Sequence, residues 1–133
     1  MNLFQNQSKN WSEIKANDSW ALFKIMAEFV DGYEKMSMIG PCVSFFGSAR
    51  TPSDDPQYQL TVDVAEAVVK SGLGVITGGG PGIMEAANLG AKKAGGISVG
   101  LNINLPFEQK SNDYIDHDKL MNFEYFFVRK VMF

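Results

Sequence analysis

The residues of this sequence best suited to chemistry include a run of glycines, TGGGPG at 77–82. The run stands between a short apolar segment and a segment with helical periodicity. Glycines there let the backbone approach a ligand closely, and the N–H groups and positive dipole end of the helix attract an anion, typically a phosphate. We therefore predict phosphate contacts at Gly78, Gly79, Gly80 and Gly82. The alternative is a tight turn that only packs the helix against a sheet.

The glycine run matches neither of the common nucleotide-binding loops. No Gly-Lys-Ser/Thr follows it, which disfavours a Walker loop and ATP hydrolysis. Its glycines lack the G-x-G-x-x-G spacing of a dinucleotide fingerprint and follow the second predicted strand. The third predicted strand ends in Leu101-Asn102, without an acid for a ribose diol. The run is therefore predicted to bind phosphate without either of these motifs.

Two adjacent cations, Arg129 and Lys130, follow an aromatic segment that we predict to be a buried strand. Arginine suits bidentate recognition of a phosphate or contact with a ribose hydroxyl, and its charge can act on a departing base. The alternative is a solvated pair in the first turn of a helix. Cations at a helix start oppose the macrodipole, so the pattern favours a functional role for the pair.

Polar side chains near the glycine run are further candidates. Glu85, in the first turn of the following helix, can contact a ligand hydroxyl or simply stabilise the helix start. Glu108, Gln109 and Asn112 lie in a long connection, 102–120, and can read a base or a ribose. An exposed polar loop is the alternative explanation for each member of that set.

Other catalytic chemistries are disfavoured. Ser48 is not in a G-x-S-x-G elbow, and the single histidine, His117, lies between two aspartates in a predicted loop. One histidine and one cysteine, Cys42, do not form a familiar zinc site. We therefore expect no metal and no cofactor.

The elements that must position these residues alternate between strands and helices. This order predicts a parallel sheet with right-handed crossovers, and hence a doubly wound, Rossmann-like α/β fold with flanking helices. Residues 1–17 are predicted to be a polar arm and 18–133 the Rossmann-like domain. We predict strands over 41–47, 74–77, 97–101 and 122–128, and helices over 56–71, over 81–94 and from an N-cap at Asp18 or Ser19.

The strand order decides where the site lies. In an order 3-2-1-4, ligands bind at the carboxyl ends of the strands, in the crevice between the first and fourth strands. That order brings the loop 47–50, with Gly47 and Ser48, next to Arg129 and Lys130. The glycine run after the second strand would then lie beside them.

The composition of the chain excludes some kinds of binding partner. A net charge of −3 and the lack of a basic run argue against nucleic-acid binding. Charges or glycines interrupt every apolar stretch, and the N-terminal residues lack a signal-peptide core, so we expect a cytoplasmic protein that does not cross a membrane. The apolar helix that follows Asp18 should be covered by the sheet or by a second copy of the chain.

Together these motifs resemble the LOG family, which is also labelled lysine decarboxylase-like. The segments that carry the resemblance are 47–50 (GSAR), 77–88 (TGGGPGIMEAAN), 100–112 and 125–133 (YFFVRKVMF). The resemblance runs from about residue 18 to the end of the sequence. It is closest to the longer bacterial branch, which carries an extra N-terminal helix.

The resemblance implies a cytokinin riboside 5′-monophosphate phosphoribohydrolase. Such an enzyme hydrolyses the N-glycosidic bond of a purine nucleoside 5′-monophosphate, AMP included, to free base and ribose 5-phosphate. It implies a homodimer or larger homo-oligomer, no metal, and Arg129 as a catalytic residue. The residues that it implies for substrate or phosphate binding are Gly47, Ser48, Gly78, Gly79, Gly80, Gly82, Glu85, Glu108, Asn112 and Lys130.

The sequence departs from the family pattern in one respect. The family's catalytic glutamate lies in a P-G-G-x-G-T-x-x-E motif, which these 133 residues do not contain. We therefore expect a chain truncated or cleaved before that motif, or one whose missing part another chain supplies, with the C-terminal part of the fold absent and little or no nucleosidase activity alone. The alternative is a non-catalytic nucleotide- or phosphate-binding module, similar to molybdenum-cofactor carriers.

Overall fold

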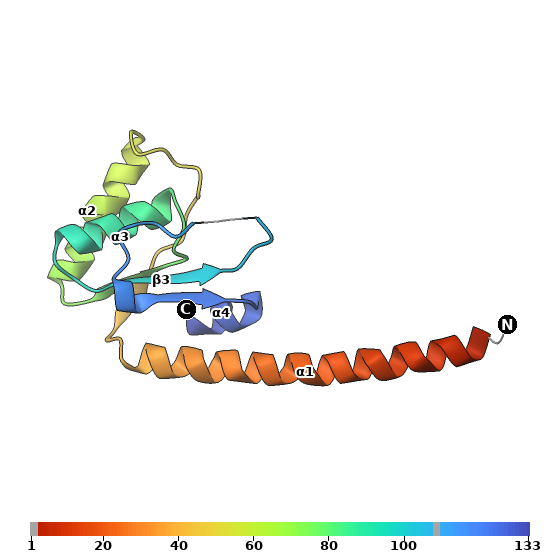
Figure 1. Cartoon of the computed structure of the whole chain (residues 1–133). Helices are drawn as coiled ribbons and strands as arrows, with labels where there is room; N and C mark the ends of the chain where they lie inside the picture. The colour runs from red at the N-terminus through yellow and green to blue at the C-terminus, as the bar shows by residue number, and fades with distance from the viewer. Residues whose placement is uncertain (1–2, 108–109) are drawn as a thin grey trace.

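The computed structural model describes residues 3–107 and 110–133, and it describes the side chains of the first helix from residue 11 onward. Its core is a four-stranded parallel sheet with helices on both faces (Figure 1), the Rossmann-like α/β fold that the sequence predicts. The elements, in chain order, are α1 (Leu3–Ser37), β1 (Cys42–Ser44), α2 (Pro56–Lys70), β2 (Gly74–Thr77), α3 (Ile83–Lys93), β3 (Ser98–Ile103), the short 3-10 helix η1 (His117–Lys119), β4 (Leu120–Phe123) and α4 (Phe126–Met132).

The strands lie in the order β1-β2-β3-β4, so the predicted order 3-2-1-4 is wrong. In the observed register Val75 pairs with Ser98, and Gly100 pairs with Leu120. Burial explains the difference. All six residues of β3 are buried and its neighbours are β2 and β4, whereas the residues of β1 are only half-buried and β1 lies at an edge. Among the described strands β1 and β4 are not neighbours, so no topological switch lies between these two.

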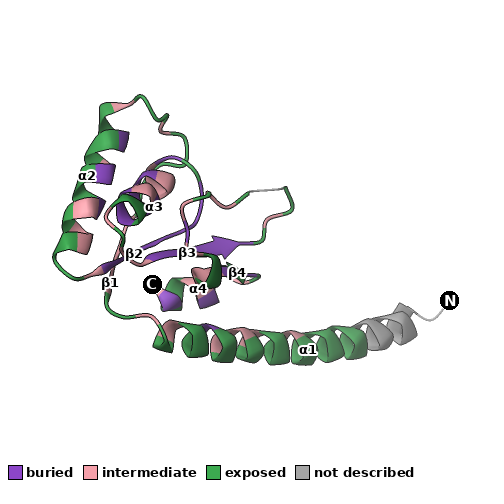
Figure 2. Ribbon diagram, turned by 60° about the vertical axis from the view of Figure 1, so that its left-hand side comes forward, coloured by how far each residue is buried: buried purple, intermediate pink, exposed green. Residues whose placement is uncertain are grey.

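Helices α2 and α3 cover one face of the sheet, and α1 and α4 cover the other (Figure 2). The small residues predicted on α3 allow close contact with α2, because a Cβ at Gly90 would collide with the carbonyl oxygen of Val62. Ala65, Ala87 and Ala91 pack with Val75 beneath these helices. On the opposite face Leu101 and Val128 belong to a larger cluster, against which Ile25 and Phe29 of α1 pack.

Helix α1 begins at Leu3, so the helix start predicted at Asp18 or Ser19 is wrong. The Ser19 hydroxyl donates to the carbonyl of Lys15 within the helix instead of capping it. No glycine or proline occurs before Gly32 to interrupt the helix. Its 35 residues correspond to a length of about 52 Å, and its N-terminal half extends past the sheet (Figure 1).

The predicted fourth strand also needs correction. Strand β4 ends at Phe123, and Phe126, Phe127 and Val128 lie in α4. A short apolar run does not distinguish a buried strand from a helix by periodicity alone. Arg129 therefore lies within a helix, one residue after the buried Val128, and not directly after a strand. The other predicted boundaries are shifted only slightly, with α3 beginning at Ile83.

Candidate functional site

The glycine run follows β2 and forms a buried loop against the loop after β1. Gly79 and Gly82 have positive φ angles of 80° and 71°, which only glycine adopts readily. The Thr77 hydroxyl accepts the Gly79 N–H at 3.0 Å, and the Ile83 N–H donates to the Ser48 carbonyl at 2.9 Å. A Cβ at Gly82 would collide with the Ser48 carbonyl oxygen. The structure thus brings together the two loops singled out from the sequence.

Several backbone donors at this loop are free to bind an anion. In the described part of the chain, the N–H groups of Gly80, Gly82, Met84 and Glu85 find no protein acceptor. Gly80 and Gly82 are buried, where an unpaired N–H is costly. The positive end of the α3 dipole lies at the same place. This arrangement suits a phosphate or carboxylate ligand.

Arg129 reaches the same loop from α4. Its Nε–H donates to the Leu101 carbonyl at 2.6 Å, and one Nη–H donates to the Gly78 carbonyl at 3.2 Å. The guanidinium therefore joins the carboxyl ends of β2 and β3, and its Cζ lies 5.5 Å from the centre of the Phe133 ring. Burial lowers the pKa of the Arg129 guanidinium. Because the usual pKa of arginine is very high, the group still stays charged at neutral pH. Its remaining N–H groups have no acceptor among the described residues.

A pocket of about 310 Å³ lies between these parts. Gly47, Gly78 and Arg129 line it, so three of the predicted site residues share one cavity. Its volume is at the lower end of the range for small-molecule sites. The other lining residues are apolar: Phe45, Phe46, Met84, Ile103, Leu105 and Phe126.

A wider hollow of about 560 Å³ continues from the pocket along α4. Arg129, Phe46 and Phe126 line both cavities, and Lys130 lines only the wider one. Lys130 is exposed and points to this outer hollow rather than to the glycine loop. The two cations predicted as a pair thus share the wider hollow, and of the two Arg129 alone also lines the 310 Å³ pocket.

Asn112 supports the glycine loop. Its Nδ2 group donates to the Gly80 carbonyl and to Asn88 Oδ1, both at 3.0 Å, and its backbone N–H donates to the Gly79 carbonyl at 2.9 Å. Both amide N–H groups of the side chain are therefore engaged by protein. This geometry suits a residue that holds the loop, and the predicted contact with a base or ribose stays a prediction.

Asn88, at the centre of this network, was not singled out from the sequence. It is fully buried, accepts from the Thr77 hydroxyl at 2.6 Å, and donates to the Ser98 hydroxyl at 2.8 Å. The one feature of the sequence that marks it is its position on the face of α3 otherwise formed by alanine and glycine. A polar side chain on such a face needs buried partners.

The remaining candidates lie apart from the pocket. Glu85 accepts a hydrogen bond of 2.7 Å from the Tyr58 hydroxyl, which directs it toward α2. The Ser48 hydroxyl accepts the Arg50 N–H at 3.1 Å in a local turn. Glu108 and Gln109 lie outside the described residues.

Over the described ranges, no cluster of three or more His, Cys, Asp or Glu side chains is arranged to hold a metal ion. Over the same ranges, no helix combines the length and apolar character needed to cross a membrane.

The parallel sheet, flanking helices and glycine loop define a Rossmann-like α/β protein. Within that class the chain belongs to the SLOG cluster4 family, whose model matches residues 41–121, more than half of the sequence. The SLOG superfamily includes LOG-like proteins. The matched segment contains the glycine loop and Asn112 and ends before Arg129.

One solved structure similar to this chain is the X-ray structure of TM1055. The two are 26% identical with a TM-score of 0.42, over 62% of this chain and 45% of TM1055. The chain thus spans less than half the length of that protein. No curated protein matches the sequence significantly.

Proposed function

We propose that the chain forms the nucleotide site of a phosphoribohydrolase that acts on purine nucleoside 5′-monophosphates. The 5′-phosphate binds the glycine-loop N–H groups and the α3 dipole, and the base enters the pocket lined by Phe46 and Phe126. The observation that carries the proposal is the placement of Arg129, whose guanidinium lies between the glycine loop and this apolar pocket. A cation there faces both the phosphate and the glycosidic bond of a bound nucleotide.

The reaction needs little covalent chemistry from the protein. The bond between C1′ and the base nitrogen breaks, its electron pair goes to the base, and a water molecule adds to C1′ and supplies the proton that the base takes up. Arg129, fixed by two carbonyls, contributes by positioning the nucleotide and by its charge. In the resemblance to the LOG family, a glutamate engages the ribose or the water. The P-G-G-x-G-T-x-x-E motif that carries it is not in these 133 residues.

A second candidate is a nucleotide-binding module without catalysis. The lining of the pocket favours it, because among the described residues Arg129 is the one charged side chain in an otherwise apolar set with two glycines. An apolar pocket with a single cation binds a nucleotide without activating water.

Titration of the isotope-labelled chain with AMP, followed by NMR, tests the shared claim of both candidates. We expect shifts in the amides of Gly80, Gly82 and Met84. The Arg129→Lys variant keeps the charge but loses the guanidinium fork, so its affinity should fall about tenfold. Lys93→Gln, at the far end of α3, should bind AMP normally. Unperturbed glycine-loop amides at saturating AMP would refute both candidates.

Adenine release then separates the two candidates. The protein isolated from its native source, incubated with AMP, should release adenine and ribose 5-phosphate if it is a phosphoribohydrolase. AMP binding with no adenine release under these conditions would favour the non-catalytic module.

A further inference from the structure

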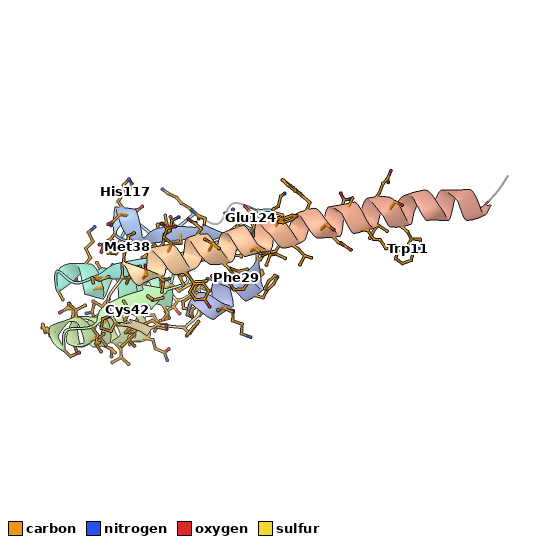
Figure 3. The ribbon with its side chains drawn as sticks, turned by 90° about the horizontal axis from the view of Figure 1, so that it is seen from below. Trp11, Phe29, Met38, Cys42, His117 and Glu124 are labelled. Carbon is orange, nitrogen blue, oxygen red and sulfur yellow. The ribbon has the colours of Figure 1, made fainter. Side chains whose placement is uncertain are left out.

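Glu28 of α1 binds the start of α4, a segment far from it in sequence. Its two carboxylate oxygens accept the backbone N–H groups of Glu124 at 3.1 Å and of Tyr125 at 3.2 Å. Figure 3 shows Glu124 beside the middle of α1. Tyr125 is the N-cap residue of α4, and its own side chain makes no capping bond. Glu28 therefore caps α4 from another helix, and a negative charge at a helix start is favourable.

The cap lies one helical turn from Arg129. The Arg129 N–H donates to the Tyr125 carbonyl at 3.1 Å, so the residue that Glu28 holds is also the hydrogen-bond partner of Arg129. From there the Arg129 side chain reaches the carbonyls of Leu101 and Gly78. A continuous series of hydrogen bonds thus links α1 to the glycine loop.

Helix α4 depends on such support. It has seven residues, and helices this short are unstable without tertiary contacts. The rings of Phe29 and Phe127 lie 6.4 Å apart between α1 and α4. A Cβ at Gly32 would lie 2.9 Å from Met132 Cε, so α1 also fits closely against the last turn of α4. Glu28 supplies the polar contact at the first turn.

We propose that Glu28 is a positioning residue for Arg129, through which α1 sets the affinity of the glycine-loop site for phosphate ligands. The part of this inference that concerns AMP rests on the proposed function. The part that concerns the placement of Arg129 does not. Glu28 accepts from the backbone of Glu124 and Tyr125, and neither of these two residues lines the 310 Å³ pocket.

The Glu28→Gln variant tests the proposal, with Glu34→Gln, an exposed glutamate on the same helix, as the matched control. An amide keeps the shape of the side chain but loses one acceptor and the charge. The first readout is hydrogen exchange of the Arg129 Nε–H, a signal assigned by its loss in Arg129→Lys. The second is the affinity for inorganic phosphate and for AMP, measured by NMR titration.

Glu28→Gln should raise the exchange rate of the Arg129 Nε–H about tenfold and weaken phosphate binding about three- to tenfold. The control should change neither value. Glu28→Asp keeps the charge but shortens the side chain, and it should give the same two effects. It provides an independent test if Glu28→Gln does not fold.

Unchanged Arg129 exchange in a folded Glu28 variant would overturn the proposal. If exchange rises in both Glu28 variants while wild-type protein binds phosphate but not AMP, the positioning role stands and the proposed nucleotide function fails. If exchange rises but phosphate affinity is unchanged, Glu28 holds Arg129 without setting affinity, and the proposal is overturned in that respect.

Discussion

Arg129 occupies the space that a side chain on residue 78 would fill. Its guanidinium donates to the Gly78 carbonyl at 3.2 Å, and a Cβ at Gly78 would collide with the same Nη group. Gly78 has no positive φ angle, so its backbone conformation does not require glycine. The positions of Arg129 and of Met84, whose Sδ would lie 2.9 Å from the same Cβ, explain the absence of a side chain there.

Gly78→Ala should therefore displace Arg129 and weaken phosphate binding about tenfold. The added methyl in a closely packed site should also cost about 1–3 kcal/mol of unfolding free energy. NMR titration with phosphate and urea denaturation measure the two effects.

The control for this variant is Gly40→Ala. A Cβ at Gly40 meets no atom within 4 Å, and its φ is not positive. The substitution should leave phosphate affinity unchanged and alter stability by no more than about 1 kcal/mol, in the stabilising direction. Equal phosphate affinity of Gly78→Ala and Gly40→Ala would show that Arg129 does not need this space.

Asn88→Ala should be the most destabilising of the single polar truncations in the glycine-loop network. It removes the partner of Thr77, Asn112 and Ser98 at once in a fully buried place. Buried groups left without partners cost about 1–3 kcal/mol each, and relaxation or water reduces the sum, so we expect about 3 kcal/mol in urea denaturation.

Asn104→Ala provides the comparison for Asn88. The exposed Asn104 amide donates to Glu124 Oε1 at 2.6 Å, and its loss should cost less than about 1 kcal/mol. A loss of stability in Asn88→Ala no larger than in Asn104→Ala would contradict the role of Asn88 as the centre of the network.

The sequence predicts the individual helices and strands of this fold well, because glycine and proline mark where many of them begin or end. Pro56 is the first residue of α2, and Gly72, with a φ of 92°, follows its end. The buried strand β2 leads directly into the glycine run, as its apolar residues indicate. Gly47, Gly78 and Arg129 were all chosen from the sequence, and all line one pocket.

The features that could not be predicted depend on contacts between distant residues. The place of β3 between β2 and β4 follows from burial on all sides, which local periodicity does not reveal. Asn112 is predicted to contact a ligand because it lies in a long polar loop, and that contact stays a prediction. Its bond to Gly80, 32 residues earlier in the chain, identifies it as a support of the glycine loop.

The same reasoning applies to α1. Its polar N-terminal residues lack the apolar periodicity that predicts a helix, but extending an existing helix avoids the cost of nucleation, and no glycine or proline interrupts α1 before Gly32. Trp11 lies on the half of α1 that extends past the sheet (Figure 3), where it is 63% exposed. The bonds of Glu28 could not be predicted from the sequence, because its partners are backbone groups nearly a hundred residues later.

Tyr58→Phe should lower stability and change its dependence on alkaline pH. Burial, and then the hydrogen bond to Glu85, raise the pKa of the Tyr58 hydroxyl above its usual value. The folded state thus keeps the phenol neutral. The stabilisation that the Tyr58 hydroxyl contributes is fully present below the tyrosine pKa of the unfolded chain, about 10. It is lost as pH rises further, because tyrosine ionises more readily in the unfolded chain.

At neutral pH the loss of the hydrogen bond to Glu85 should cost about 1 kcal/mol in urea denaturation. Above about pH 10 the stability of Tyr58→Phe should fall less steeply than that of the wild type. Tyr33→Phe, at an exposed position on α1, should reproduce neither effect. A pH dependence identical in wild type and Tyr58→Phe would show that Tyr58 does not contribute to the alkaline decline.

A pair of glycine substitutions measures how closely the two loops of the site must approach. Gly82 and Gly95 have similar positive φ angles, 71° and 73°. A Cβ at Gly95 meets nothing within 4 Å, whereas a Cβ at Gly82 would collide with the backbone of Ser48 and Ala49. Gly95→Ala should therefore cost about 1–2 kcal/mol for its backbone conformation alone.

Gly82→Ala should cost at least about 2 kcal/mol more, because neither loop backbone can move away without breaking the bond from Ile83 to Ser48. Urea denaturation of both variants gives the difference, and phosphate titration should show weaker binding in Gly82→Ala alone. Equal losses of stability in the two variants would mean that the loop after β1 can move away from the added methyl without a loss of stability. That loop would then not fix the shape of the anion site.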